Sequence, residues 1–261
     1  MMDINTAILE SIKEEFINSD ELLARNEWET YTYDNIAVPR VSHILKACNL
    51  SIEPLMRWAN NLGYRHTDYV QARNVAAEKG TRIHNAIEAF IKERKVPNYH
   101  DIYNDEIKHA VYNGFEGFAA FWNNYRYKDQ IKEVKMEQTL VTPYFGGTYD
   151  LTITLKDGRN FLYDFKTTNS LKWEQFVQLS AYKFALENYY ATNISAIGVL
   201  LIDKSKPSCK EYLLDLAIPS NQMYVTYCEQ CFISMLNTFY NCTRTKEKFN
   251  DIRKDILIKG E

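Results

Sequence analysis

The pattern of hydrophobic and polar residues changes near the middle of the chain. Up to about residue 128, apolar residues recur with the period of an α-helix, and beyond it they alternate with a period of two. One short segment of the first half, residues 31–39, is expected to be extended and to end at Pro39. The expected helices of the first half cover residues 3–24, 42–49, 51–62, 67–95 and 102–127. Ser42 and Ser51 are the predicted caps of two of them, and Gly80 is a candidate interruption of the fourth.

The second half predicts a sheet with helices around it. Period-two alternation indicates strands over residues 131–141, 145–155 and 160–168. A helix is expected next, then two further strands and a last helix, over residues 171–190, 194–203, 209–217 and 220–246. This order predicts an α/β fold with a mixed central sheet flanked by helices and a mostly helical N-terminal half. No low-complexity linker interrupts the chain. We therefore expect one domain, residues 1–261, with a helical part (1–128) and a sheet-containing core (129–261).

The short segment Lys156-Asp157-Gly158-Arg159 predicts how two of the strands pair. A three-residue turn with glycine in the left-handed conformation would place Leu155 opposite Arg159. Counting back along both strands then puts Asp150 directly opposite Asp164. This register gives one mainly polar face and one apolar face, and it places Tyr149 on the apolar one. A two-residue turn would put Asp150 and Asp164 on different faces, so we reject it.

Asp164 and Lys166 occupy one face of a strand that is otherwise apolar. Two carboxylates a few ångströms apart repel each other unless a cation or a shared proton lies between them. Carboxylate ligands suit Mg²⁺ or Mn²⁺, and a neighbouring ammonium can orient a water or stabilise an oxyanion. These groups predict metal-assisted phosphodiester hydrolysis. The alternative at this point is a surface salt bridge between neighbouring strands.

The helix that follows this strand adds two more polar residues. Gln178 and Tyr182 are four positions apart and therefore share one helical face. Such a pair is also common at the edge of an ordinary core. Its place directly after the Asp-x-Lys strand favours a connection with the charged residues.

Five short motifs, in order, resemble the PD-(D/E)XK nuclease superfamily and its RecB-like branch. They are Val38-Pro39-Arg40-Val41-Ser42, Gly80-Thr81-x-x-His84, Gly147-Thr148-Tyr149-Asp150, Asp164-Phe165-Lys166 and Gln178-x-x-x-Tyr182. The likeness covers residues 31 to 190 and is to phage exonucleases and to the mitochondrial genome maintenance exonuclease. It implies a restriction-endonuclease-like core.

The resemblance also implies a role for each matching residue. His84, Asp150 and Asp164 would bind Mg²⁺ or Mn²⁺ with the Phe165 carbonyl, and Lys166 would orient the attacking water. Gln178 and Tyr182 would support the site or contact DNA. Glu88, one turn after His84, and Glu137, on the first strand, are further acidic candidates close to the metal. For Glu88, an ordinary exposed helix position is an equal alternative.

Composition limits how this chain can bind nucleic acid. The formal net charge is −3 and the pI is about 6.0, which excludes a uniformly basic surface but allows a local basic groove. The candidate DNA contacts are Ser42, Arg73, Lys79, Arg82 and Lys172. The alternative is that these are ordinary solvated residues on helix surfaces.

Other features bear on compartment and cofactors. The first residues lack a basic and then apolar signal segment, and the run Ile194–Ile202 is about half the length of a membrane span. We therefore expect a cytoplasmic protein, within a bacterial host cell if phage-encoded, and no membrane partner. Some relatives implied by the resemblance hold an iron–sulfur cluster through one early and three late cysteines. Cys48, Cys228, Cys231 and Cys242 follow that order, but the helical pattern around the last three favours buried helix cysteines and no cluster.

Together these features predict a metal-dependent deoxyribonuclease, an exonuclease acting on single-stranded DNA or DNA ends in phage-type replication, recombination or repair. Partner proteins from replication or recombination are part of this expectation. Two alternatives stay open. One is a catalytically silent DNA-binding or scaffolding protein on the same fold, and the other is an endonuclease or end-trimming factor within a larger complex.

Overall fold

A computed structural model of the chain describes residue 9, residues 31–48 and residues 53–258. The expected helix 3–24 and the expected cap Ser51 lie outside the described residues, apart from residue 9. The elements follow in the order β1 (Tyr31–Tyr33), β2 (Ile36–Val38), α2 (Val41–Ala47), α3 (Glu53–Tyr64), α4 (Tyr69–Glu93), α5 (Asp105–Asn123), β3 (Ile131–Val141), β4 (Gly146–Leu155), β5 (Asn160–Lys166), α6 (Trp173–Tyr189), β6 (Ala196–Ile202), β7 (Cys209–Asp215) and α7 (Pro219–Ile258). Short 3₁₀ turns at Tyr99–Asp101 and Lys128–Gln130 flank α5.

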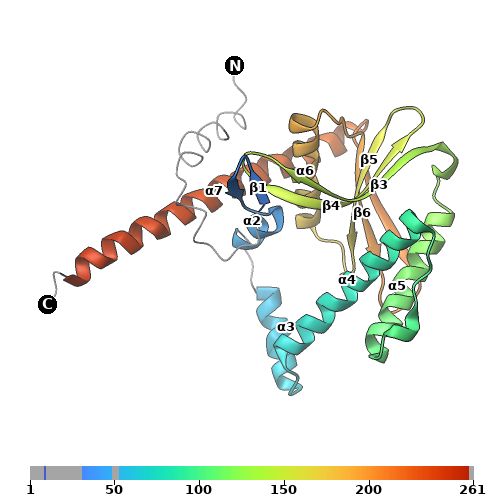
Figure 1. Ribbon diagram of the computed structural model, residues 1–261, viewed down its shortest axis with the longest axis horizontal. Helices are drawn as coiled ribbons and strands as arrows, with labels where there is room; N and C mark the ends of the chain where they lie inside the picture. The colour runs from blue at the N-terminus through green and yellow to red at the C-terminus, as the bar shows by residue number, and fades with distance from the viewer. Residues whose placement is uncertain (1–8, 10–30, 49–52, 259–261) are drawn as a thin grey trace.

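A five-stranded mixed sheet forms the centre of the protein (Figure 1), in the order β3-β4-β5-β6-β7. β5 and β6 are parallel, and the other neighbouring pairs are antiparallel. Helix α6 makes the crossover that a parallel pair requires. The predicted α/β fold with a mixed sheet and a helical N-terminal half is therefore confirmed.

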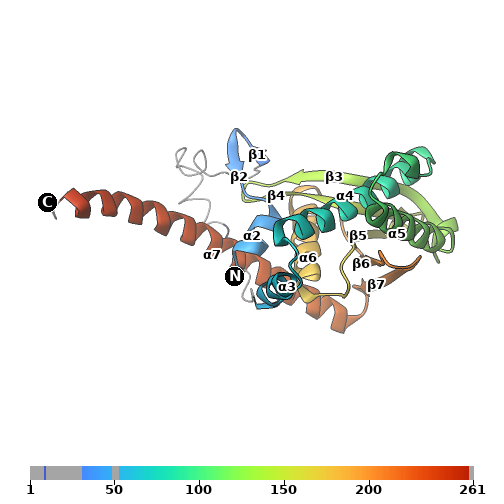
Figure 2. The same cartoon turned by 90° about the horizontal axis from the view of Figure 1, so that it is seen from below.

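Two hydrophobic cores cover the two faces of the sheet. On one face, Leu162 and Val199 pack with side chains of α2, α6 and α7. On the other face, Phe161 and Phe165 pack with side chains of α4 and α5. Leu9 is buried in the first of these cores. The C-terminal half of α7 extends well beyond the sheet (Figures 1 and 2).

The turn between β4 and β5 has the predicted form. The Leu155 amide donates to the Arg159 carbonyl over 2.8 Å, and the Gly158 amide donates to Leu155 over 3.0 Å. Gly158 adopts φ +92°, where a side chain would be strained. Leu151 pairs with Tyr163 in the same register. The next residues along the two strands, Asp150 and Asp164, are therefore opposite each other.

Tyr149 lies on the opposite face from the one expected. It packs with α6 in the first core, where its ring centroid is 6.5 Å from that of Tyr182. Met136 and Leu140 of β3 likewise contribute to opposite cores, although strict alternation would place them together. The alternation breaks at Glu137, which has φ +50°. A residue in this conformation changes the direction in which the following side chains point.

Several helix boundaries also differ from expectation. α2 begins at Val41, so Ser42 lies within its first turn, and Arg40 holds the N-cap position without a side-chain cap bond. α4 runs without a break at Gly80. α7 continues past residue 246 to Ile258, because it contains no glycine or internal proline to end it. Within the described residues, none of the helices combines the length and apolarity needed to cross a membrane.

Close packing of α5 against the loop after β6 gives a test of this arrangement. A Cβ added at Gly117 would lie 2.4 Å from the backbone nitrogen of Ser208, whereas one added at Gly63 in α3 meets nothing within 4 Å. We expect Gly117→Ala to lower the free energy of unfolding by about 1–3 kcal/mol. Gly63→Ala, the matched control, should leave it unchanged or raise it by up to about 1 kcal/mol. Urea unfolding checks both, and equal stability of the two variants would contradict the packing.

Candidate metal centre and active site

Three side chains from different elements converge where β3 and β4 meet α4. His84 comes from α4, Glu137 from β3 and Asp150 from β4, and their ligand atoms all lie within 4.8 Å of one another. His84 Nδ1 is 3.5 Å from Asp150 Oδ1 and 3.9 Å from Glu137 Oε1. The His84 ring packs edge-on against Phe165, with 5.5 Å between ring centroids. Each side chain is partly shielded yet open enough to meet a ligand.

The backbone at Glu137 is unusual for this residue type. Glu137 has a positive φ of +50°, and among the described residues it is the one non-glycine residue of the central sheet with such a value. The other five such residues lie in turns or just after helices, including Asp34 and Asn35 in the β1–β2 turn. A left-handed conformation costs an L-residue roughly 1–2 kcal/mol. Strain of this kind is often found at functional sites, and here it accompanies a carboxylate that faces His84.

A second chain of polar contacts begins at Asp164 and ends at Tyr182. Lys166 Nζ lies 2.6 Å from Asp164 Oδ2 and donates to Gln178 Oε1 over 3.0 Å. Gln178 Nε2 then donates to the Tyr182 hydroxyl over 3.2 Å. The structure thus brings together the four residues of the Asp-x-Lys and Gln-x-x-x-Tyr motifs. These contacts fix the Lys166 ammonium from two sides.

Asp150 links this chain to the cluster of His84, Glu137 and Asp150. One of its carboxylate oxygens accepts a hydrogen bond from the Phe165 amide, between Asp164 and Lys166. Its other oxygen faces His84. The two groups of residues are therefore adjacent, because Asp150 belongs to the first and is bonded to the backbone between Asp164 and Lys166 of the second.

Gly147 explains part of the segment that precedes Asp150. A Cβ at this position would lie 2.5 Å from Tyr182 Cε1. The absence of a side chain lets the Tyr182 ring lie directly on β4. Gly147 therefore has a packing role in the Gly-Thr-Tyr-Asp motif, which holds α6 against the strand that carries Asp150.

Burial and neighbouring charges shift the pKa values of Asp164 and Lys166. Burial raises the pKa of Asp164 to about 6, a rise that Lys166 opposes and Asp150 reinforces. Burial acts to lower the pKa of Lys166, but Asp164 and Asp150 outweigh it and hold this pKa above its ordinary value. Lys166 is therefore an ammonium at neutral pH. It can supply positive charge and orient a water, but it cannot act as a general base.

The donor set at His84 fits a divalent cation. Burial acts to lower the pKa of His84, but the neighbouring carboxylates of Asp150 and Glu137 raise it to about 10. Two carboxylates and one imidazole are ligands that Mn²⁺ accepts, and carboxylates suit Mg²⁺. A metal bound through His84 Nδ1 would replace the proton that these carboxylates now stabilise. Asp164 lies outside the compact cluster of three, although it interacts electrostatically with His84.

The sequence indicated Glu137 only as a further acidic candidate, whereas the structure places it among the three clustered side chains. Its side chain belongs to the compact cluster, whereas Glu88 is ion-paired with Lys92 at 2.6 Å on α4. The sequence carries no signal for this feature of Glu137, because positive φ values are normally associated with glycine, asparagine or aspartate.

The candidate DNA contacts are distributed over three helices. Arg82 is ion-paired with Glu78 at 2.8 Å, and Lys79 is ion-paired with Glu106. The Arg73 guanidinium lies 5.9 Å from the centroid of the Tyr69 ring. Two further candidates stand elsewhere in the fold: Ser42 lies within α2, and Lys172 is exposed at the start of α6.

The cysteines considered for a cluster lie near the contact between α2 and α7. Cys48 Sγ donates to the Met235 carbonyl over 3.2 Å, and burial raises its pKa, helped by Cys242 and Cys231. Cys228, Cys231 and Cys242 all belong to the unbroken helix α7. Eleven helical positions separate Cys231 from Cys242, which corresponds to about 16 Å along the axis.

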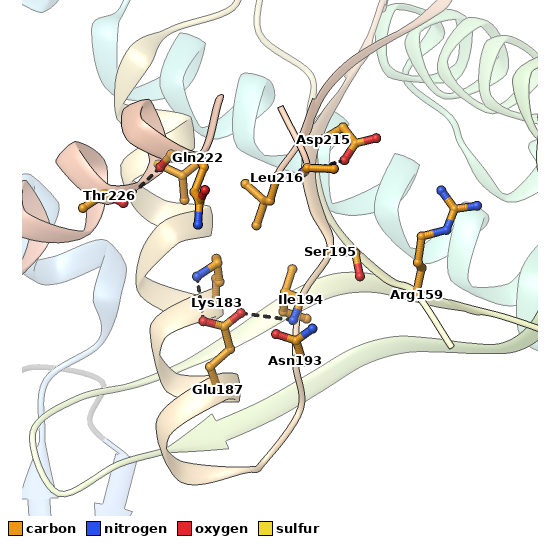
Figure 3. Close-up of a pocket in the computed structure, with 12 residues that line it drawn as sticks. Arg159, Lys183, Glu187, Asn193, Ile194, Ser195, Asp215, Leu216, Gln222 and Thr226 are labelled. Carbon is orange, nitrogen blue, oxygen red and sulfur yellow. Dashed lines mark hydrogen bonds and ion pairs between the residues drawn. The ribbon is translucent and has the colours of Figure 1, made fainter. Parts of the chain in front are cut away.

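A separate pocket of about 510 Å³ lies at the opposite edge of the sheet, where β5 and β6 begin (Figure 3). Lys183 is at its centre and is ion-paired with Glu187 at 2.6 Å and Glu229 at 2.9 Å. Glu187 also accepts from the Ile194 amide over 3.1 Å. The two charged residues at the centre of this pocket, Lys183 and Glu187, are therefore already ion-paired, and the pocket does not include the motif residues.

Comparison with known proteins does not assign a family. No family model matches the chain, and no curated protein matches it significantly. Among solved structures, one described as "Crystal structure of SSO0001" matches with a TM-score of 0.27 and 13% identity, over 60% of this chain and 85% of that chain. A likeness at this level supports no inference about fold or function.

Metal binding tests the cluster without reference to any activity. We expect Mn²⁺ titration by calorimetry to show one site that is lost in Asp150→Asn and strongly weakened in His84→Ala. Lys166→Ala should bind Mn²⁺ about as well as the unmodified protein, because the ammonium is not a ligand. Glu133→Gln, an exposed carboxylate change on the same strand as Glu137, is the matched control. Equal Mn²⁺ affinity in Asp150→Asn and Glu133→Gln would contradict the site.

The strained backbone at Glu137 makes its own prediction. Glycine tolerates positive φ and alanine does not, so Glu137→Gly should be more stable than Glu137→Ala by about 1 kcal/mol. At Lys135, an exposed position of the same strand that pairs regularly with Thr152, the order should reverse. Chemical denaturation of the four variants checks this. If alanine is the more stable residue at both positions, the strain assigned to Glu137 is absent.

Proposed function

We propose that the protein is a divalent-metal-dependent nuclease that hydrolyses phosphodiester bonds of DNA, most readily at its ends. The observation that carries this proposal is the continuity of the site. Asp150 belongs to a compact cluster of side chains that could hold a metal ion, and it also accepts a hydrogen bond from the Phe165 amide, between the buried Asp164 and its ion-pair partner Lys166. The order of the sequence motifs, which resembles RecB-like nucleases, supports the same reaction. It also supplies the expected substrate, single-stranded DNA or DNA with free ends.

Each residue has a role that follows from its contacts. His84, Glu137 and Asp150 would hold the cation, and the resemblance adds Asp164 and the Phe165 carbonyl. When bound, Mg²⁺ or Mn²⁺ supplies the Lewis acidity that phosphodiester hydrolysis needs. The set does not depend on Glu88, which pairs with Lys92.

Lys166 acts on the water and on the charge that develops at phosphorus. Its ammonium is held by Asp164 and Gln178, so its position is fixed before substrate arrives. Water attacks the phosphorus atom, the bond to the leaving oxygen breaks, and that oxygen gains a proton. The products are a hydroxyl end and a phosphate end. Tyr182 holds Gln178 in place and remains protonated, because burial raises its pKa well above its ordinary value.

Cleavage of labelled DNA tests this proposal directly. With Mg²⁺ or Mn²⁺ present, we expect the protein to degrade end-labelled linear DNA. Asp164→Asn should abolish cleavage while preserving the fold, because it removes a charge without changing shape. Lys166→Ala should lower the rate by a factor of about 10² or more, the size of effect seen on removing one group that stabilises transition-state charge. Glu133→Gln, an exposed carboxylate change on β3, is the matched control.

The outcomes separate the proposal from its alternatives. Cleavage of linear but not closed circular DNA supports an exonuclease, and cleavage of both supports an endonuclease. DNA binding without cleavage under any divalent cation would favour a scaffolding role. Activity of Asp164→Asn within a few-fold of the unmodified protein would show that the site is elsewhere.

A further inference from the structure

The carboxyl ends of the two parallel strands place a second charged region beside the site. In the β5–β6 pair, Lys166 lies opposite Leu201. The loop after β6 therefore leaves the sheet at the same edge as Thr167, which directly follows Lys166. Neighbouring strands are about 4.8 Å apart, so the two loops begin side by side. Ligands of α/β proteins bind preferentially at this edge of parallel strands.

Helix α4 brings a lysine to the same edge. A Cβ added at Gly80 would lie 3.2 Å from Thr167 Oγ1, so α4 passes very close to the loop after β5. Lys79 is the preceding residue. Only 13% of its side chain is exposed, and it is ion-paired with Glu106, whose side chain is 72% exposed. Lys79 is thus the fixed member of the pair, and Glu106 is the solvated one.

The loop after β6 holds Lys204 in a fixed place. The Asp203 amide donates to the Ser208 carbonyl over 2.9 Å, and Asp203 Oδ1 accepts from the Ser205 amide over 2.8 Å. The Lys204 carbonyl accepts from Asn113 Nδ2 of α5 over 3.1 Å. Gly117 of α5 packs directly on the Ser208 backbone. The loop is therefore anchored at both ends and in its middle.

Lys204 and Lys79 are close enough to repel each other. Burial lowers the pKa of Lys204, and the charge of Lys79 lowers it further. Within the part of the chain that the structure describes, no carboxylate lies within ion-pair distance of Lys204, and Lys79 has Glu106 as its partner. Glu106 compensates the charge of Lys79 from the solvent side, whereas the charge of Lys204 has no such partner, so an anion bound beside both lysines would stabilise them. The position of the pair, beside the loop that follows Lys166, makes a phosphate group the natural anion.

We propose that Lys204 and Lys79 together bind a backbone phosphate of the nucleic acid, next to the phosphodiester group that is cleaved. This inference rests on the proposed function, since the substrate is taken to be DNA. The contact is independent of base sequence, because two ammonium groups recognise charge and not base edges. It positions the strand relative to Lys166 and takes no part in the chemistry.

Salt-dependent binding of a single-stranded oligonucleotide tests the contact. The experiment uses full-length protein carrying Asp164→Asn, a labelled oligonucleotide and fluorescence anisotropy over a range of NaCl concentrations. Lys204→Ala should weaken binding and flatten the slope of log affinity against log salt by about 0.7, the value for one phosphate contact on single strands. Lys204→Arg should keep both. The matched control is Lys132→Ala, an exposed lysine near the β4–β5 turn at the opposite edge of the sheet.

A second variant is expected to increase the affinity for DNA. Glu106→Gln frees Lys79 from its carboxylate partner, so it should tighten binding and steepen the salt slope. Its control is Glu133→Gln, which makes the same charge change near the far edge of the sheet. Thermal unfolding confirms that each variant is folded.

The outcomes distinguish this inference from the function on which it rests. If the Asp164→Asn protein does not bind DNA at all, the proposed function fails and the contact fails with it. If that protein binds DNA but Lys204→Ala behaves like Lys132→Ala, the nuclease proposal stands and the phosphate contact is overturned. A Glu106→Gln variant no tighter than Glu133→Gln would overturn the part assigned to Lys79.

Discussion

The turn formed by Lys156, Asp157 and Gly158 sets the register of β4 against β5, on which the whole site depends. Gly158 adopts φ +92°, and the Leu155 amide bonds to the Arg159 carbonyl over 2.8 Å. A slip of one residue would turn Asp150 away from Asp164. The Phe165 amide would then lose its bond to Asp150, and the cluster of His84, Glu137 and Asp150 would separate from the Asp164–Lys166 pair. A local turn thus determines which side chains meet at the other end of the hairpin.

The site concentrates charge in a place where charge is costly. Asp164 is 3% exposed, yet it stays next to Asp150 because Lys166 lies 2.6 Å away. At neutral pH, the three carboxylates of Glu137, Asp150 and Asp164 face two cations, the Lys166 ammonium and the His84 imidazolium. The sum is one negative charge. Exchange of the His84 proton for a divalent cation would bring the site to neutrality, which explains why the donor set suits such an ion.

Much of the fold and part of the site could be predicted from the sequence. Period-two alternation located β3, β4 and β5 to within two residues at each end, and the Lys-Asp-Gly-Arg segment predicted the register of β4 against β5. The spacing of Gln178 and Tyr182 placed both on the side of α6 that meets Lys166. These features could be predicted because each depends on a few neighbouring residues with strong local preferences.

The remaining features depend on contacts between distant segments. The positive φ of Glu137 and the side change of Tyr149 follow from how β3 and β4 meet α4 and α6, which no local preference encodes. Ser42 does not cap α2, since the helix begins one residue earlier. The approach of Lys204 to Lys79 depends on the anchoring of the β6–β7 loop by α5. Such features require the three-dimensional arrangement.

The central claim is that the cluster of His84, Glu137 and Asp150 and the Asp164–Lys166 pair form one metal-dependent centre. The most direct measurement is the anomalous scattering of Mn²⁺ in crystals of the full chain. The account predicts an anomalous peak with oxygen or nitrogen atoms of Asp150 and His84 about 2 Å away, since directly coordinated hard cations lie at this distance. The peak should disappear in Asp150→Asn and persist in Lys166→Ala. A fully occupied Mn²⁺ peak elsewhere, with none beside Asp150, would contradict the account.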